Sequence, residues 1–176
     1  MFDDDGLLIF QQSYKVLDEL GDDSLAPTFA MIDPFGLKGV PLSTIARIAK
    51  HERCEVMFSL MTESMVRFMS GDIFPPLMDE VFGTDKWRGA LYLESGDKAL
   101  FLRDLYAEQL RSVGFSYVPP GFELRDEGNK VEYYLMFGTK NLTGLTKMKD
   151  AMWAVDKSGN YRFSGFEANS IQMTLI

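Results

Sequence analysis

Short apolar runs alternate with amphipathic stretches along the chain, a pattern that predicts alternating strands and helices. Thr28–Ile32 has no polar alternation, and Cys54–Leu60 is apolar apart from two residues. Both runs therefore predict strands that are buried on both faces. Pro41–Lys50 lies between them with apolar side chains at helical spacing and a proline in the first turn. A strand, a helix and a second strand in this order favour a parallel pair with a right-handed crossover.

The patterns on either side of this unit predict further short elements. Before it we expect a strand and a helix, at Leu7–Phe10 and Ser13–Leu20. After it we expect a helix capped by Thr62 and ended by a Pro-Pro pair, and then a helical turn, at Thr62–Met69 and Leu77–Phe82.

The C-terminal half begins with the longest helical pattern, Asp97–Val113. An extended segment, residues 115–124, and a strand, Val131–Phe137, flank a charged turn, which predicts an antiparallel hairpin. Asn141–Val155 predicts another helix, and Tyr161–Phe163 an edge segment. The inward face of that last helix is expected to be Leu142, Leu145, Met148, Met152 and Val155.

Together these elements predict an α/β fold with an open, partial Rossmann-like sheet. Parallel strands precede a C-terminal antiparallel hairpin, and helices cover both faces of the sheet. The sequence shows no internal repeat and no linker, so we predict a single domain over residues 1–176.

Composition narrows the function. The 176 residues are 46% hydrophobic and carry a net charge of -8, which indicates a globular chain and argues against a dominant basic nucleic-acid surface. The net charge does not exclude a basic groove on one part of the surface. The single cysteine excludes an internal disulfide and a cysteine-rich metal site. An acidic N-terminus and the lack of a long apolar run favour a cytoplasmic protein without a membrane span.

The most function-like stretch follows the first strong strand, where the apolar run stops at Asp33. A proline, an aromatic residue and two glycines come next, and the following helix starts at Pro41. In an open α/β sheet, ligands bind in the loops at the carboxyl ends of such strands. The alternative is that Asp33 caps the following helix or holds the loop, while Phe35 packs.

The order of elements resembles the second half of a class I S-adenosylmethionine-dependent methyltransferase. Asp33 opens a loop that sits where those enzymes carry a [DN]-P-P-[YF] motif, whose polar groups bind an exocyclic amine while its aromatic ring stacks on the flipped base. The resemblance implies Asp33 as a catalytic residue and Pro34, Phe35, Gly36 and Lys38 as substrate-binding residues. Phe35 replaces the second proline of the motif, and Gly36 its aromatic residue.

A resemblance over most of the chain is to the three-Cys-motif partner protein family. The segments that carry it keep the family's order: Thr28–Pro41, Tyr106–Arg111, 132–139 and 144–163. Members are usually longer, and their N-terminal part resembles the cofactor half of a methyltransferase. The family is named for a neighbouring gene whose product carries a three-cysteine, radical-enzyme-like motif. The resemblance implies a protein of that kind as a partner.

A cofactor site is not expected within this sequence. Class I methyltransferases bind the cofactor on a Gly-rich loop after the first strand. Only 27 residues precede Thr28, they contain no G-x-G, and two βα units need roughly 30 residues each. We therefore expect a truncated member or C-terminal fragment that does not bind S-adenosylmethionine alone and holds no metal. A full-length relative would be the place for that cofactor.

Loss of the cofactor half would leave Thr28–Ile32 with an exposed apolar edge. We therefore expect a homo-oligomer joined across that edge, or pairing of the edge with Leu7–Phe10. The resulting hypotheses are a methyltransferase-like half acting on nucleic acid, a non-catalytic partner protein, and, ranked last, a hydrolase or nuclease. The last lacks a G-x-S-x-G elbow and a paired-acid motif.

Other chemistry-bearing residues have simpler explanations. Cys54 and His51 form a weak nucleophile–base candidate, because a small buried residue at the start of a strand explains the cysteine better. The acids of Asp3–Asp5 and Asp22–Asp23 lack the spacing of a calcium loop. A C-terminal group mixes charge with aromatic rings, which suits single-stranded nucleic acid but also a helix surface over a core. Its members are Lys147, Lys149, Trp153, Tyr161 and Arg162.

Overall fold

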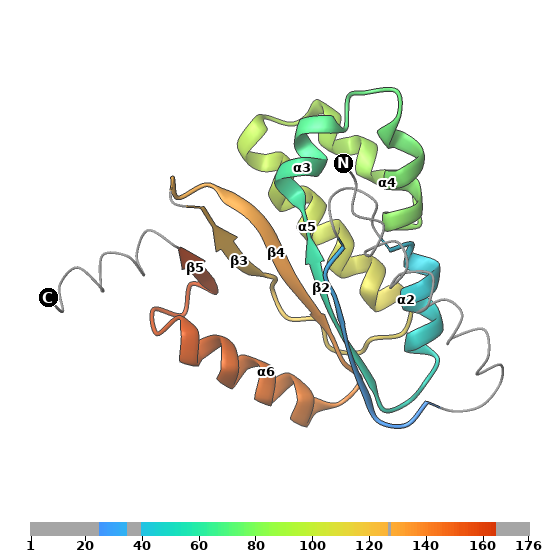
Figure 1. Ribbon diagram of the computed structural model, residues 1–176, viewed down its shortest axis with the longest axis vertical. Helices are drawn as coiled ribbons and strands as arrows, with labels where there is room; N and C mark the ends of the chain where they lie inside the picture. The colour runs from blue at the N-terminus through green and yellow to red at the C-terminus, as the bar shows by residue number, and fades with distance from the viewer. Residues whose placement is uncertain (1–24, 35–39, 127, 165–176) are drawn as a thin grey trace, which may run out of the picture.

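A computed structural model of the chain describes residues 25–34, 40–126 and 128–164. In this part of the chain a five-stranded mixed sheet has the strand order β1-β2-β4-β3-β5, with helices packed against it (Figure 1). The predicted α/β class with an open, partial Rossmann-like sheet is confirmed. The predicted elements at Leu7–Phe10 and Ser13–Leu20 lie outside the described residues.

The elements have the following bounds. The strands are β1 (Thr28–Ile32), β2 (Cys54–Leu60), β3 (Phe122–Arg125), β4 (Val131–Gly138) and β5 (Arg162–Ser164). The α-helices are α2 (Leu42–Ala49), α3 (Thr62–Phe68), α4 (Phe74–Phe82), α5 (Ser95–Ser112) and α6 (Leu142–Val155). A 3-10 helix, η1, covers Lys86–Tyr92.

The sheet joins a parallel pair to an antiparallel hairpin. β1 pairs with β2 in parallel, as predicted, with Thr28 opposite Cys54. β3 and β4 form the predicted antiparallel hairpin, and Asn129 in its turn has a φ of 63°. β4 also pairs antiparallel with β2, placing Leu60 opposite Tyr134. The second strand of the hairpin therefore lies inside the sheet and connects the two halves of the chain.

The main core lies on one face of the sheet, beneath α2, α3, α4 and α5. Side chains that point to this face from β2 and β4 are almost fully buried, and α5 contributes the fully buried Tyr106 ring, which packs on Phe58 with a 4.9 Å centroid separation. The central core members of the two strands are Val56, Phe58, Leu60, Tyr134 and Met136. The opposite face carries α6, which runs away from β1 toward β3 and β5 (Figure 1).

The prediction that β1 is buried on both faces is wrong. Phe29 is 50% exposed and Met31 is 64% exposed, whereas the intervening Ala30 packs against the core. The physical reason is that alternate side chains of a strand point to opposite faces, and α6 does not extend over β1. Helices therefore pack on only one face of β1.

The predicted inward face of α6 is wrong at the two ends of the helix. Leu142 and Val155 are each 59% exposed, Leu145 and Met148 are half-buried, and Met152 is buried. A helix that lies over a narrow strip of sheet buries a narrower stripe than one in a thick core, so the ends of the predicted stripe face outward.

Two local predictions in the helical layer are corrected as well. Thr62 does not cap α3: the N-cap is Met61, and the buried Thr62 hydroxyl has no hydrogen-bond partner in the described structure. Pro75 and Pro76 form the first turn of α4, where a missing N–H leaves no helical bond unmade. Gly83 ends α4 with a φ of 63°, as the sequence indicated.

The start of α6 is fastened to β2 through Glu55. The Thr139 hydroxyl donates a 2.7 Å hydrogen bond to a Glu55 carboxylate oxygen, and the Asn141 side chain caps α6 by accepting a bond from the Thr143 N–H. Gly144 makes room for this carboxylate, because a Cβ there would lie 1.9 Å from Glu55 Oε1. A negative group near a helix N-terminus is also favourable.

We predict that Gly144→Ala destabilises the protein by about 1 to 3 kcal/mol, because overpacking would displace Glu55. This loss should exceed the gain of about 1 kcal/mol that alanine brings to a helix. Urea unfolding measures it. Gly96→Ala in α5 is the matched control, since nothing lies within 4 Å of its Cβ position. If Gly144→Ala were as stable as that control, the close approach would be disproved.

Candidate functional site

Two of the predicted site residues, Asp33 and Pro34, lie at the carboxyl edge of the parallel strands. Asp33 follows β1 directly and is exposed, and Pro34 beside it is half-buried. Phe35, Gly36 and Lys38 lie outside the described residues. α2 has Pro41 at its N-cap position and no side-chain cap. Asp33 is therefore not the cap of the following helix, which removes one of the two alternatives for this residue.

β4 brings an aromatic side chain to this edge. Burial raises the pKa of Tyr133 above its ordinary value, and the negative charges of Asp33 and then Glu132 raise that pKa further. Because Tyr133 responds to the Asp33 charge, the phenol and the carboxylate belong to one electrostatic neighbourhood. No hydrogen bond or ion pair is recorded for the Asp33 side chain within the described residues. The pair thus combines an acceptor with an aromatic ring.

An ion-paired rim borders the same edge of the sheet. Glu63, at the start of α3, accepts hydrogen bonds from Arg67 and, at 2.9 Å, from Lys130 in the turn before β4. These partners lower the pKa of Glu63, the Lys130 hydrogen bond most strongly. Arg67 and Lys130 are 60% and 66% exposed, so water screens these pairs. Their role is to tie α3 to the hairpin turn.

Sequence reasoning missed Tyr133 as a site residue. The position of Tyr133 in the strand could have indicated it. Tyr134 faces the core, so the neighbouring Tyr133 points to the other face of the sheet. That alternation does not say which residue of another strand the ring will meet. The pairing of β2 with both β1 and β4 places Asp33 and Tyr133 on either side of β2, at the same edge of the sheet.

Trp87 and Arg88 fasten η1 to α4. The buried Trp87 indole donates a 2.8 Å hydrogen bond to Asp79, and Arg88 donates bonds of 2.6 and 3.0 Å to its two oxygens. The guanidinium also lies 4.6 Å from the Trp87 ring. Arg88 and then Trp87 lower the pKa of Asp79. These contacts explain both residues structurally.

The other sequence candidates do not come together as sites. Cys54 is buried, and His51 Nδ1 accepts a 3.1 Å hydrogen bond from the Leu25 N–H. Lys147 and Lys149 are exposed on α6. Within residues 25–34, 40–126 and 128–164, no group of three or more His, Cys, Asp or Glu side chains is arranged to hold a metal ion. The acidic segments Asp3–Asp5 and Asp22–Asp23 lie outside these ranges.

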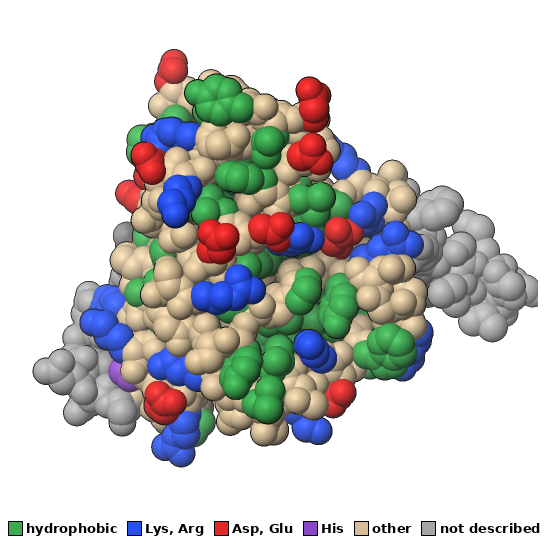
Figure 2. Space-filling view, turned by 180° about the vertical axis from the view of Figure 1, so that it is seen from behind, with side chains coloured by type: hydrophobic (Ala, Val, Ile, Leu, Met, Phe, Trp, Pro, Cys, Tyr) green, Lys and Arg blue, Asp and Glu red, His purple; other side chains and the backbone are tan. Residues whose placement is uncertain are grey.

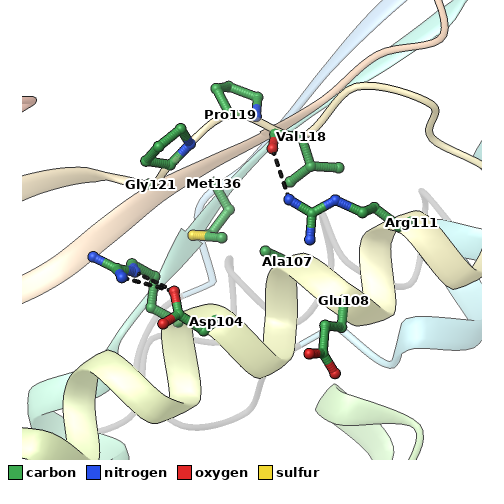
Figure 3. Close-up of a pocket in the computed structure, with 10 residues that line it drawn as sticks. Asp104, Ala107, Glu108, Arg111, Val118, Pro119, Gly121 and Met136 are labelled. Carbon is green, nitrogen blue, oxygen red and sulfur yellow. Dashed lines mark hydrogen bonds and ion pairs between the residues drawn. The ribbon is translucent and has the colours of Figure 1, made fainter.

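A shallow groove lies on the helical side of the sheet, between α5 and residues 118–121 (Figure 3). Met136 forms part of its lining, and Arg111 donates a 3.1 Å hydrogen bond across it to the Val118 carbonyl (Figure 3). Figure 2 shows acidic and basic side chains side by side on this back face of the molecule. The mixture of signs does not form the single-sign basic patch that nucleic acid favours.

A second hollow, of about 400 Å³, lies at the amino ends of β1 and β2. Phe29, Arg53 and Lys140 are among its lining residues. Lys140 lies 3.7 Å from Glu52, an exposed carboxylate at the same end of the sheet. This hollow is at the end of β1 opposite Asp33, so it is separate from the predicted site.

No family model, curated protein or solved structure matches this chain. In the part of the chain that the structure describes, every helix is too short or too polar to span a membrane.

We predict that Asp33→Asn lowers the pKa of Tyr133, because one of the negative charges that disfavour tyrosinate is removed. Glu132→Gln should lower it less, since Glu132 contributes less than Asp33. Ultraviolet titration of tyrosinate measures the shift, with Tyr133→Phe as the subtracted reference.

The linked stability change has a defined sign. A raised folded pKa means that the unfolded chain loses the Tyr133 proton first, at about pH 10, so stability falls as pH rises past that value. Asp33→Asn should reduce this alkaline loss. An unchanged Tyr133 pKa in Asp33→Asn would show that the two groups are not electrostatic neighbours.

Proposed function

We propose that this chain forms the substrate-side half of a class I methyltransferase-like sheet and acts as a non-catalytic partner of another protein. The three-Cys-motif partner family provides the precedent, through the sequence segments that resemble it. The fold supports the proposal: a parallel pair, a long helix and an antiparallel hairpin follow one another in the order of that half.

The observation that carries the proposal is the position of Asp33. Its carboxylate is exposed at the carboxyl end of β1, where an α/β sheet binds ligands. The sequence before Thr28 contains no G-x-G to hold a dinucleotide-like cofactor. An exposed carboxylate that can accept hydrogen bonds, without a G-x-G segment before it, favours binding of a partner over catalysis.

A second candidate is the substrate-side half of an S-adenosylmethionine-dependent enzyme that modifies nucleic acid. The presence of Asp33 and Tyr133 at the same edge of the sheet favours it, because a base amine needs an acceptor and its ring needs an aromatic surface. Pro34, Phe35, Gly36 and Lys38 would then line the base pocket. The net charge of -8 argues against tight binding of the phosphate backbone.

The proposed setting is the cytoplasm, with self-association of the chain through β1. Among the described strands β1 pairs with β2 alone, which leaves its other side at the edge of the described sheet. A three-Cys-motif protein would bind at the carboxyl edge that displays Asp33. S-adenosylmethionine belongs, in this proposal, to a longer relative.

We predict that the 176-residue chain shows no saturable heat on titration with micromolar S-adenosylmethionine in a calorimeter. The reason is that its sequence contains no G-x-G segment of the kind that holds the cofactor. S-adenosylhomocysteine is a useful second ligand. Saturable binding of either would overturn the proposal.

A second measurement separates the two candidates. In a full-length relative, the residue equivalent to Asp33 is replaced by alanine, with a replacement at the Glu132 equivalent as control. Loss of methyl transfer only in the first variant favours the enzyme. Unchanged methyl transfer together with weakened binding to a purified three-cysteine-motif protein favours the partner role.

A further inference from the structure

β1 has a polar edge and an apolar face that are both self-complementary. Its five residues carry no charge and no proline, so it lacks the usual devices that keep an edge strand from pairing. Phe29 and Met31 project from the face that α6 leaves open, and they are 50% and 64% exposed. The strand therefore offers hydrogen-bonding groups and apolar side chains at the same place.

The direction of the backbone groups follows from the pairing with β2. The Thr28 N–H donates a 3.1 Å hydrogen bond to the Arg53 carbonyl, so the polar groups of Thr28 point toward β2. Successive residues of a strand alternate in this direction. Those of Phe29 and Met31 consequently point outward, toward the open edge of the described sheet.

We propose that two copies of this chain associate by antiparallel pairing of β1 with β1, with Ala30 on the two-fold axis. In this register Phe29 of one copy lies opposite Met31 of the other, and the two residues exchange both N–H···O bonds. The same two side chains also meet as a cross-strand apolar pair. The inference rests on the self-association proposed above and specifies its register and symmetry.

The two ends of the strand carry complementary charge. Asp33 follows β1 at its carboxyl end, while Arg53 precedes β2 at the amino end, and both are exposed. Antiparallel pairing brings the carboxyl end of each β1 to the amino end of the other. Asp33 of one copy thus approaches Arg53 of the second copy, twice in each dimer.

The hollow at the amino end of β1 fits this arrangement. It is open beside Phe29, and its lining mixes two cationic side chains, Arg53 and Lys140, with two acidic ones, Glu52 and Glu55. In the proposed register Asp33 of the second copy lies opposite Pro27, at the border of this hollow and on the side of Arg53. A second copy therefore matches the exposed apolar face and the outward backbone groups, and it also brings Asp33 near Arg53, which an unrelated extended peptide would not do.

The test begins with the mass of the wild-type chain by analytical ultracentrifugation over a range of concentrations. We expect a mass of two chains. Met31→Lys should weaken the dimer by on the order of tenfold or more, because a lysine on an edge strand opposes pairing. Tyr92→Lys is the matched control, since Tyr92 in η1 is 89% exposed and lies away from β1; its dimer should be unaffected.

Cysteine crosslinking tests the register. Residues opposite each other in a non-hydrogen-bonded antiparallel pair have Cα atoms about 4.5 Å apart, which a disulfide spans. Ala30→Cys should therefore give a crosslinked dimer on mild oxidation. Thr28→Cys should not, because Thr28 lies opposite Ile32 of the second copy. The native Cys54 is buried and serves as background in the wild-type chain.

Each outcome decides one point. A wild-type mass of one chain at all concentrations overturns both the self-association and its register. A dimer that survives Met31→Lys overturns β1 as the interface. A dimer that crosslinks through Thr28→Cys but not Ala30→Cys overturns the register alone. Circular dichroism confirms that Met31→Lys is folded. Binding of S-adenosylmethionine would overturn the proposed function without changing any of these masses.

Discussion

The pairing of β2 with β4 is the interaction on which the rest of the structure depends. β2 belongs to the parallel unit and β4 to the hairpin, and Val56 lies opposite Gly138 where they meet. Without this pairing, Phe58 and Tyr134 would have no common core face for α5 to cover. Because β1 attaches through β2 and β3 attaches through β4, the positions of Asp33 and Tyr133 are both consequences of one ladder.

Local chemistry explains why much of the fold was predictable. β1 and β2 were located to the residue. The apolar run of β1 ends at Asp33, a charged residue that changes the pattern. Helix ends were also readable where Gly83 and Asn141 have specific backbone or capping roles. These signals act within a few residues, so they need no knowledge of the fold.

The errors concern which neighbour covers an element. The apolar sequence of β1 favours burial of both of its faces. It does not show that α6 leaves Phe29 and Met31 exposed. In α6 the helical spacing located the buried and half-buried residues Leu145, Met148 and Met152, but it did not show that Leu142 and Val155 at the two ends are exposed. Tyr133 was missed because its position at the same edge of the sheet as Asp33 depends on two strand pairings between distant segments. The sequence pointed to Asp33 and Pro34 after β1, whereas Tyr133 became a candidate only from the strand pairing.

The separation of β2 and β4 along the chain also shapes how the protein reaches this state. Contacts between distant segments form slowly, because a long loop must close before any of its bonds are gained. The unit from β1 to β2 is local by comparison and can form first. During that interval both edges of a two-stranded apolar ribbon are open to other chains. Newly made protein is then at its greatest risk of aggregation, and the arrival of β4 ends that risk on one side.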